Sequence, residues 1–327
     1  MKTPGRPTAR CLRDDIPNDW AEIGDHRATA NLSDCPKPLY ELQHPIVQKM
    51  AEDFPVSGSD DVRREGISGL KNPMWWKVKV GSRWRGAAYV DEDGQAWLCA
   101  AGYRREKEGT DFYKSFMARI ESRGPAPFLP TVEDRELLRG ERQNALMQQW
   151  EAQLIGWARA WTLEALDADD VVEHLLENPL GRDLAVVRVL CDAEAVTDVA
   201  IYLEFQLQDW SVTELLEWAE QVFVSSICCH EQHWAVTYLR EGRAYSLETG
   251  REELQRALRT KESNSAPGVM SGGAQSHYTH RERIVDSMVE GEALKALCGQ
   301  WFVPRQDTRD REPCPTCVAV HERLPTR

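Results

Sequence analysis

Two groups of residues in this sequence have types and spacings that could carry out chemistry. In the first, large apolar and basic side chains alternate, so that Lys77 and Lys79 are separated by a single residue. Since the side chains of a β-strand point to opposite faces in turn, both lysines should lie on one exposed face. Seven Lys or Arg residues occur between residues 63 and 89, against one acid, Glu65. In a chain with a formal net charge of -13, this local reversal suggests a polyanionic partner. The alternative is a solvated sheet face whose lysines discourage edge pairing.

The second group lies near the C-terminus, where Cys314 and Cys317 are separated by two residues. Such a spacing lets one backbone turn point two thiolates at one metal ion. Cys298 lies upstream of this pair, and His277 or His280 lies further upstream, with His321 as another imidazole in the segment. Soft sulfur and nitrogen ligands in so small a segment fit a structural Zn²⁺ ion, because a segment of this length cannot build a sufficient apolar core. A redox dithiol is the competing interpretation, but no βαβ pattern supports it.

A third cluster contains Cys228, Cys229, His230 and His233 within six residues. A catalytic cysteine would need a base and an orienting carboxylate, which Glu248 could supply. Metal binding is a second interpretation. The third is a buried cysteine pair with histidines at the entrance to a strand, and we favour it because short motifs often occur by chance.

The strands that must position the basic residues lie within the stretch from residue 70 to residue 113, and helices are expected before it. Strands are expected over residues 75–80, 83–90 and 95–102, with Asp93-Gly94 as the hairpin turn between the last two. Helices are expected before them, over residues 36–54 and 61–70. The sequence therefore predicts an antiparallel meander preceded by helices, with one cationic face.

This order of features resembles the RelE family of ribosome-dependent mRNA endonuclease toxins, over residues 44–120. The matching features are Leu70-Lys71, Lys77-Val78-Lys79, Trp84-Arg85, the turn at residues 91–94, Gly102-Tyr103-Arg104 and Tyr113. The stretch between Arg104 and Tyr113 is a few residues longer than is usual in that family.

The resemblance implies RNA cleavage by attack of a ribose 2′-OH on the adjacent phosphate, without a catalytic metal. It makes Lys77 and Lys79 the general base and its phosphate-orienting neighbour, since nearby cations lower the pKa of a lysine. Arg85 and Arg104 would hold the scissile phosphate, and Tyr113 would stack on a base or orient the nucleotide. The neighbouring residues expected to contact RNA are Arg83, Trp84 and Arg105.

The C-terminal segment resembles the DUF3039 family, a small domain of unknown function, over residues 276–324. The motifs that carry this resemblance are HYTHRER, ALCGQWFVP and EPCPTC. It favours a zinc site made of His277, Cys298, Cys314 and Cys317, with His280 and His321 as substitutes for His277.

Charge and composition divide the chain into several parts. Residues 133–259 contain 25 acids against 11 bases, the reverse of the lysine stretch. A long amphipathic helix is expected over residues 146–161, a second helix over 213–223, strands over 184–190 and 199–205, and a hairpin over 234–247. We therefore expect a multi-domain α+β protein. Its parts are a mobile extension (1–35), a RelE-like domain (36–125), an acidic α/β middle domain (131–260), a linker (262–275) and a zinc module (276–327).

Composition also limits the functional classes. The sequence has no run of eighteen apolar residues and no apolar signal segment, so we expect a cytoplasmic protein without membrane association, with its nine cysteines reduced. The leading hypothesis is a RelE-like ribonuclease whose partners are the ribosome and mRNA, restrained by an antitoxin or by its own middle domain. The alternatives are a non-catalytic RNA- or ribosome-binding protein, and an interaction or regulatory protein built around the middle domain and the zinc module.

Overall fold

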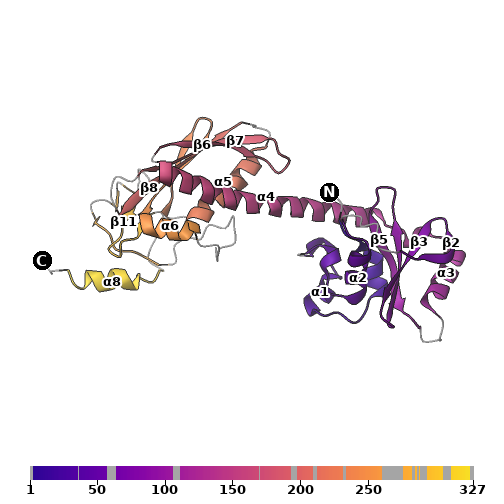
Figure 1. Cartoon of the computed structure of the whole chain (residues 1–327). Coiled ribbons are helices and arrows are strands. Elements are labelled where there is room, and N and C mark those ends of the chain that lie inside the picture. Colours follow the sequence, from indigo (N-terminus) through magenta and orange to yellow (C-terminus); the bar gives the residue numbers. More distant parts are fainter. Residues whose placement is uncertain are drawn as a thin grey trace. The chain divides into compact units, whose positions relative to one another are not determined.

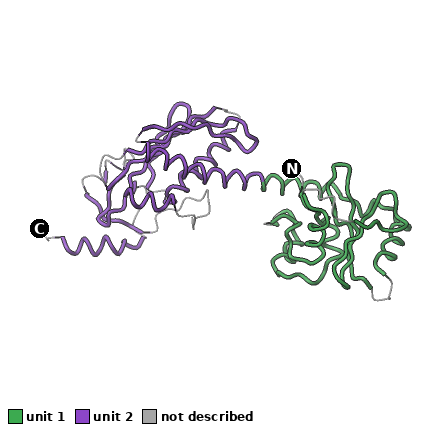
Figure 2. The backbone as a smooth tube through the Cα atoms, viewed as in Figure 1, with its two compact units in different colours: residues 1–145 green, residues 146–327 purple. Residues whose placement is uncertain are grey.

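The chain forms two compact units, residues 1–145 and residues 146–327 (Figure 2). The computed structural model describes residues 3–35, 37–56, 64–105, 111–168, 170–192, 197–208, 212–230, 233–259, 275–281, 284, 285, 287, 293–304 and 311–324. Within these residues, no helix combines the length and the apolar character needed to span a membrane.

Unit 1 is built on a five-stranded sheet of order β1-β5-β4-β3-β2. The strands are β1 (Arg6–Pro7), β2 (Gly66–Lys71), β3 (Met74–Val80), β4 (Trp84–Val90) and β5 (Ala96–Tyr103). Strands β2 to β5 are an antiparallel meander, and β1 joins the edge of β5 in parallel. The predicted hairpin is confirmed, since Gly94 has a φ of 77° and donates its N–H to the carbonyl of Asp91.

Helices cover both faces of this sheet, with α2 (Pro45–Asp53) and α3 (Phe112–Arg123) on opposite sides (Figure 1). Apolar residues of α2, such as Ile46 and Met50, share a core with Val78 of β3. On the other face, Phe116 of α3 packs against Trp75. The remaining short helices of unit 1 are η1 (Cys11–Asp15), α1 (Ile23–Ala28), η2 (Leu32–Asp34), η3 (Leu39–Glu41) and η4 (Ala126–Phe128).

In the expected second helix, 61–70, the residues from Gly66 onward form strand β2 (Gly66–Lys71), so that prediction is wrong for the described part. Gly66 and Gly69 lower helix propensity, and Gly69 has a φ of 93°, which a helix does not allow. Residues 57–63, which include the basic Arg63, lie outside the described residues.

The N-terminal segment is part of the core of unit 1 and not the mobile extension expected from its composition. Cys11, Leu12 and Ile16 are at most 1% exposed. The Arg6 side chain is fully buried, donates to the carbonyl of Asp134 at 3.0 Å and pairs with Glu141 at 2.8 Å. These partners lie more than 120 residues away in sequence, so no local pattern could reveal them.

Helix α4 (Val132–Ala168) contributes to both units. Thr131 and Asp134 cap its first turn reciprocally, as each side chain accepts from the backbone N–H of the other. Residues up to Ala145 count with unit 1, whereas the predicted amphipathic stretch, with Trp150 and Leu154, packs in unit 2. The boundary therefore falls inside a helix and not at the proline-rich stretch near residue 125.

Unit 2 contains a second five-stranded sheet, of order β6-β7-β8-β10-β9, and every neighbouring pair is antiparallel. Its strands are β6 (Val172–Glu177), β7 (Asp183–Asp192), β8 (Asp198–Leu207), β9 (Ala235–Leu239) and β10 (Gly242–Gly250). Helices α5 (Thr213–Ile227) and α6 (Arg251–Arg259) and the second half of α4 share its core. The predicted middle-domain strands, helix and hairpin are thus confirmed, and β6 is an addition.

A small C-terminal module completes unit 2, with β11 (Leu294–Lys295), β12 (Trp301–Phe302) and α8 (Pro315–His321). Its own core among the described residues is small: the buried apolar and cysteine side chains are Leu294, Ala296, Phe302, Val303, Cys314 and Cys317. We call residues 275–324 the C-terminal module. The predicted linker falls almost wholly outside the described residues, which resume at Gln275.

Candidate functional site

The C-terminal module brings together His277, Cys298, Cys314 and Cys317, the four residues expected to hold a metal ion. Their ligand atoms all lie within 4.8 Å of one another. His277 Nδ1 lies 3.5 Å from the sulfur of Cys298 and 3.7 Å from that of Cys317. Ligands bound tetrahedrally to zinc through sulfur and nitrogen are separated by roughly 3.6 Å, given the usual bond lengths. Both distances therefore suit a metal centre.

Local backbone contacts place these four side chains. Cys298 lies in the tight turn between β11 and β12, which Gly299 completes with a φ of 89°. Cys314 is the N-cap of α8, and Cys317 lies in its first turn. The Cys314 N–H donates to the carbonyl of Ser276 at 2.8 Å, which holds the His277 segment beside the helix start. A backbone hydrogen bond from Cys317 lowers the pKa of the Cys314 thiol.

The two alternative histidines do not join this group. His280 and His321 are both exposed, and the ring of His321 packs edge-on against Tyr278. Sequence spacing left His277 and His280 as alternatives, and the tertiary structure selects His277.

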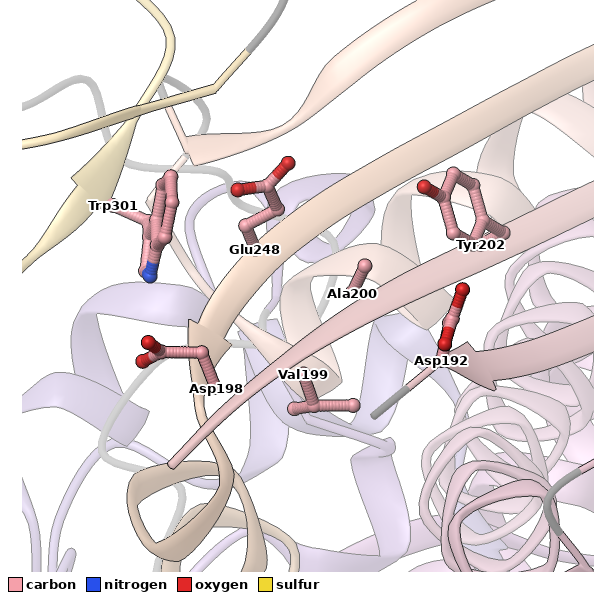
Figure 3. A pocket seen from close by; sticks show the side chains of 7 residues that line it. All are labelled: Asp192, Asp198, Val199, Ala200, Tyr202, Glu248 and Trp301. Atoms are coloured by element: carbon pink, nitrogen blue, oxygen red, sulfur yellow. The ribbon is translucent and has the colours of Figure 1, made fainter. Parts of the chain in front are cut away.

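The C-terminal module is attached to the large sheet of unit 2 by polar contacts. Lys295 Nζ lies 2.9 Å and 3.0 Å from the two carboxylate oxygens of Asp198. Gln300 Nε2 lies 3.3 Å from His233 Nε2. Trp301 lines a cavity of about 310 Å³ together with Asp192, Asp198, Tyr202 and Glu248 (Figure 3). The turn that carries Cys298 thus also places Gln300 beside His233 and Trp301 beside the cavity at the sheet.

Trp301 and Glu248 also line a second cavity, of about 210 Å³, which contains the cysteine–histidine cluster. Cys228 Sγ lies 3.4 Å from His233 Nδ1. Burial raises the pKa of the Cys228 thiol to about 12, and burial lowers the pKa of His233 to about 4. A nucleophilic cysteine acts as a thiolate, whereas this environment favours a neutral thiol beside a neutral imidazole. The arrangement therefore agrees best with the structural interpretation of the cluster.

In unit 1, the residues expected to act on RNA lie on and around the β3–β4 hairpin. Lys77, Lys79 and Arg85 share the sheet face that α3 covers, and Arg85 lies directly opposite Lys79 in the β3–β4 register. The Tyr113 hydroxyl, from α3, donates to the carbonyl of Val78 at 3.1 Å. The Lys77 ammonium lies 5.4 Å from the centre of the Tyr113 ring. Four of the five proposed catalytic residues are thus neighbours.

Arg104 follows the end of β5, where its N–H donates to the carbonyl of Arg83 at 2.7 Å. Both arginines are exposed, and so is Arg105, whose backbone pairs with Asp111. Arg83 forms a salt bridge of 2.9 Å with Asp19. Asp19 also accepts from the indole of Trp84 and has a φ of 70°, unusual for a residue other than glycine.

Two expected roles in this group do not fit the structure. Trp84 is only 2% exposed and packs beside His44 and Tyr103, so its ring cannot stack on an RNA base. Arg85 is 8% exposed, and its guanidinium donates to the carbonyls of Gly81 and Trp84. Arg85 therefore supports the β3–β4 turn.

Glu65 is the site residue that sequence reasoning passed over. Its carboxylate forms hydrogen bonds and salt bridges with both Lys77 and Lys79, one to each oxygen. These lysines, Lys77 first, lower the pKa of Glu65 to about 2. The available signal was its position as the one acid within a basic stretch.

Comparison with known proteins identifies one family. The model of a protein family of unknown function, DUF3039, matches residues 271–324 of the 327, which include all four candidate metal ligands. No curated protein and no solved structure matches the chain. The match agrees with the resemblance of the C-terminal segment, and none of the comparisons supports the resemblance of unit 1 to the RelE family.

Proposed function

We propose that the C-terminal module holds one zinc ion as a structural centre through His277, Cys298, Cys314 and Cys317. The observation that carries the proposal is the convergence of one imidazole and three thiols within 4.8 Å. Two of the six buried core residues described in this module are themselves proposed ligands, so the metal would add to a small apolar core. Bound zinc would fix the Cys298 turn and the start of α8 relative to each other.

Metal analysis of the freshly reduced full-length protein tests this proposal. We expect about one equivalent of zinc, and Cys314→Ser should reduce that content toward zero and expose the module to protease. Cys35→Ser, a half-buried cysteine in unit 1, is the matched control and should retain the metal. A zinc content near zero in the reduced wild-type protein would overturn the assignment.

For unit 1 we propose that the face around β3 binds RNA and that RNA cleavage is the activity of the chain. Lys77 and Lys79 on one face, beside Tyr113, provide positive charge on a rigid strand where a phosphate would be held. In the proposed reaction the lysine that acts as general base, Lys77 or Lys79, takes the proton of the ribose 2′-OH, and the 2′-oxygen forms a bond to phosphorus. The bond from phosphorus to the 5′-oxygen breaks, and the 5′-oxygen takes up a proton as it leaves. The products are a cyclic phosphate and a 5′-hydroxyl end. The proposed partners are the ribosome and its mRNA.

The roles of individual residues follow from their surroundings. Lys77, Lys79 and Arg104 would contact the phosphates. Arg85 would hold the β3–β4 turn through its two carbonyl contacts and so act as a positioning residue. Replacing Arg85 would disturb the turn together with any activity, so it is a poor probe of catalysis.

The test measures binding and cleavage separately. Lys77→Ala/Lys79→Ala and Arg104→Ala should weaken the binding of a single-stranded RNA and lower the slope of log K against log[salt] by about 0.7 per lost phosphate contact. Cleavage is followed by mapping new 5′ ends on ribosome-bound mRNA. Lys114→Ala removes an exposed positive charge from α3 and serves as the control. RNA binding without any new ends would favour the non-catalytic alternative, and unchanged binding in all variants would reject this face.

A further inference from the structure

Lys77 and Lys79 form a fork that already holds an anion, the carboxylate of Glu65. One carboxylate oxygen accepts from Lys77 and the other from Lys79. Two ammonium groups that converge on a pair of oxygens bound to one atom form the arrangement that also recognises a phosphate group. The carboxylate of Glu65 thus stands in for two phosphate oxygens.

The position of Glu65 follows from the sheet register. The N–H of Lys77 donates to the backbone carbonyl of Glu65 at 2.8 Å, just before Gly66 begins β2 opposite Trp76. This backbone contact fixes the main chain of Glu65 beside Lys77, and its side chain then reaches both ammonium groups. The fork is therefore filled by a residue tethered within the same sheet.

The Glu65 carboxylate can be displaced. Its side chain is 55% exposed and that of Lys79 is 45% exposed, so water can replace these contacts, and ion pairs of this kind hold their partners weakly. Lys77 is less exposed, at 19%, and lies over the Tyr113 ring, which limits the directions in which its ammonium can point. Lys77 is thus better held than the acid that lies between the two lysines.

We infer that the Lys77–Lys79 fork is a phosphate-binding site for which Glu65 competes, so that RNA must displace the Glu65 carboxylate in order to bind. This inference rests on the proposed binding of RNA by unit 1. A backbone phosphate, or the terminal phosphate of an oligonucleotide, would take the place of the carboxylate. The Glu65 side chain would then turn into solvent. An anion that binds the two lysines only weakly would not displace the Glu65 carboxylate.

The test compares full-length wild-type protein with Glu65→Gln, which keeps the size of the side chain and removes its charge. Glu92→Gln is the matched control, because it removes one exposed negative charge from the turn after β4 of the same unit. Binding of a fluorescent single-stranded RNA is measured by anisotropy. Pyrophosphate binding is followed by NMR on the backbone amides of β3.

Glu65→Gln should bind RNA roughly three- to tenfold more tightly than wild type, while Glu92→Gln changes affinity much less, since only Glu65 occupies the phosphate position. Pyrophosphate should perturb β3 at lower concentration in Glu65→Gln. Adding Lys77→Gln and Lys79→Gln to Glu65→Gln should abolish both gains.

The outcomes separate the two ideas. Equal affinities of Glu65→Gln and Glu92→Gln for both RNA and pyrophosphate would overturn the competition, whether or not wild type binds RNA. Tighter pyrophosphate binding in Glu65→Gln without RNA binding by any variant would support the phosphate fork and reject RNA as its ligand. Thermal unfolding of each variant checks that the fold is intact.

Discussion

Glu220 is a buried carboxylate whose ionisation should set part of the pH dependence of unit 2. It is 1% exposed, accepts from the Tyr245 hydroxyl at 3.0 Å and lies 3.2 Å from Arg243. Burial raises the pKa of Glu220 to about 7, against the pull of Arg243 in the other direction. The folded chain therefore binds this proton more tightly than the unfolded chain does.

The direction of the pH effect follows from this difference. Between the unfolded pKa of about 4.5 and the folded pKa of about 7, the folded state holds more protons, so the free energy of unfolding falls as pH rises. The loss should be on the order of 3 kcal/mol and nearly complete above pH 7. Glu220→Gln should remove this dependence and be more stable than wild type at pH 8, when both are measured by urea unfolding at pH 5 and pH 8.

Glu217→Gln is the control. Glu217 lies on the same helix as Glu220 and also pairs with Arg243, but its side chain is exposed. It should keep the wild-type pH profile. A Glu220→Gln profile that parallels wild type would show that Glu220 does not contribute to the pH dependence in this range.

At the scale of elements, the β11–β12 turn links the proposed metal centre to the Cys228 cavity. Cys298 lies in this turn, and Gln300 and Trp301, two and three residues later, line the cavity. Gln300 contacts His233, which contacts Cys228. A change in the proposed metal centre should therefore alter the surroundings of Cys228 through the contacts of Gln300 and His233.

Removal of the proposed metal by a chelator should make the half-buried Cys228 more accessible. We expect alkylation of Cys228 to accelerate about tenfold or more as the turn opens, because protection of a partly buried group falls with the free energy of local opening. Peptide mapping by mass spectrometry separates this thiol from the three ligand thiols. Cys191, 2% exposed in the core of unit 2, should stay protected. Equal alkylation of Cys228 before and after chelation would show that the turn does not cover it.

At the scale of the whole molecule, the smallest folded fragment that contains the lysine fork should be residues 1–145. Arg6 pairs with Glu141, and the Ala9 N–H donates to Asp134, so both ends of unit 1 are needed. A fragment of residues 36–130 lacks β1 and the start of α4. It should show no cooperative unfolding transition, because the loss of Cys11, Leu12 and Ile16 opens the core beneath α2.

The fragment of residues 1–145 also tests the role of the acidic unit 2. A tether gives an effective concentration on the order of millimolar, which makes a weak restraining contact persist. If unit 2 restrains the proposed nuclease, residues 1–145 should arrest growth and cleave mRNA more strongly than the full chain at equal expression. Equal or lower activity of the fragment would leave unit 2 as a targeting or sensing module.

The sequence by itself determined the features that depend on neighbouring residues or on ligand chemistry. Alternating apolar and basic residues predicted β3 and placed Lys77 and Lys79 on one face, and Asp93-Gly94 predicted the hairpin turn. The candidate metal ligands could be identified because Cys314 and Cys317 have the spacing that lets one backbone turn point two thiolates at one ion. In each case the signal lies within a few residues of the site.

Only the tertiary structure decided how distant residues share burial and charge. It buried Arg6 against residues of α4, withdrew Trp84 and Arg85 from solvent, and filled the lysine fork with Glu65. It also selected His277 among three histidines. The energies of these contacts depend on which distant segments pack together in the fold. A local pattern of residue types does not show which segments these are.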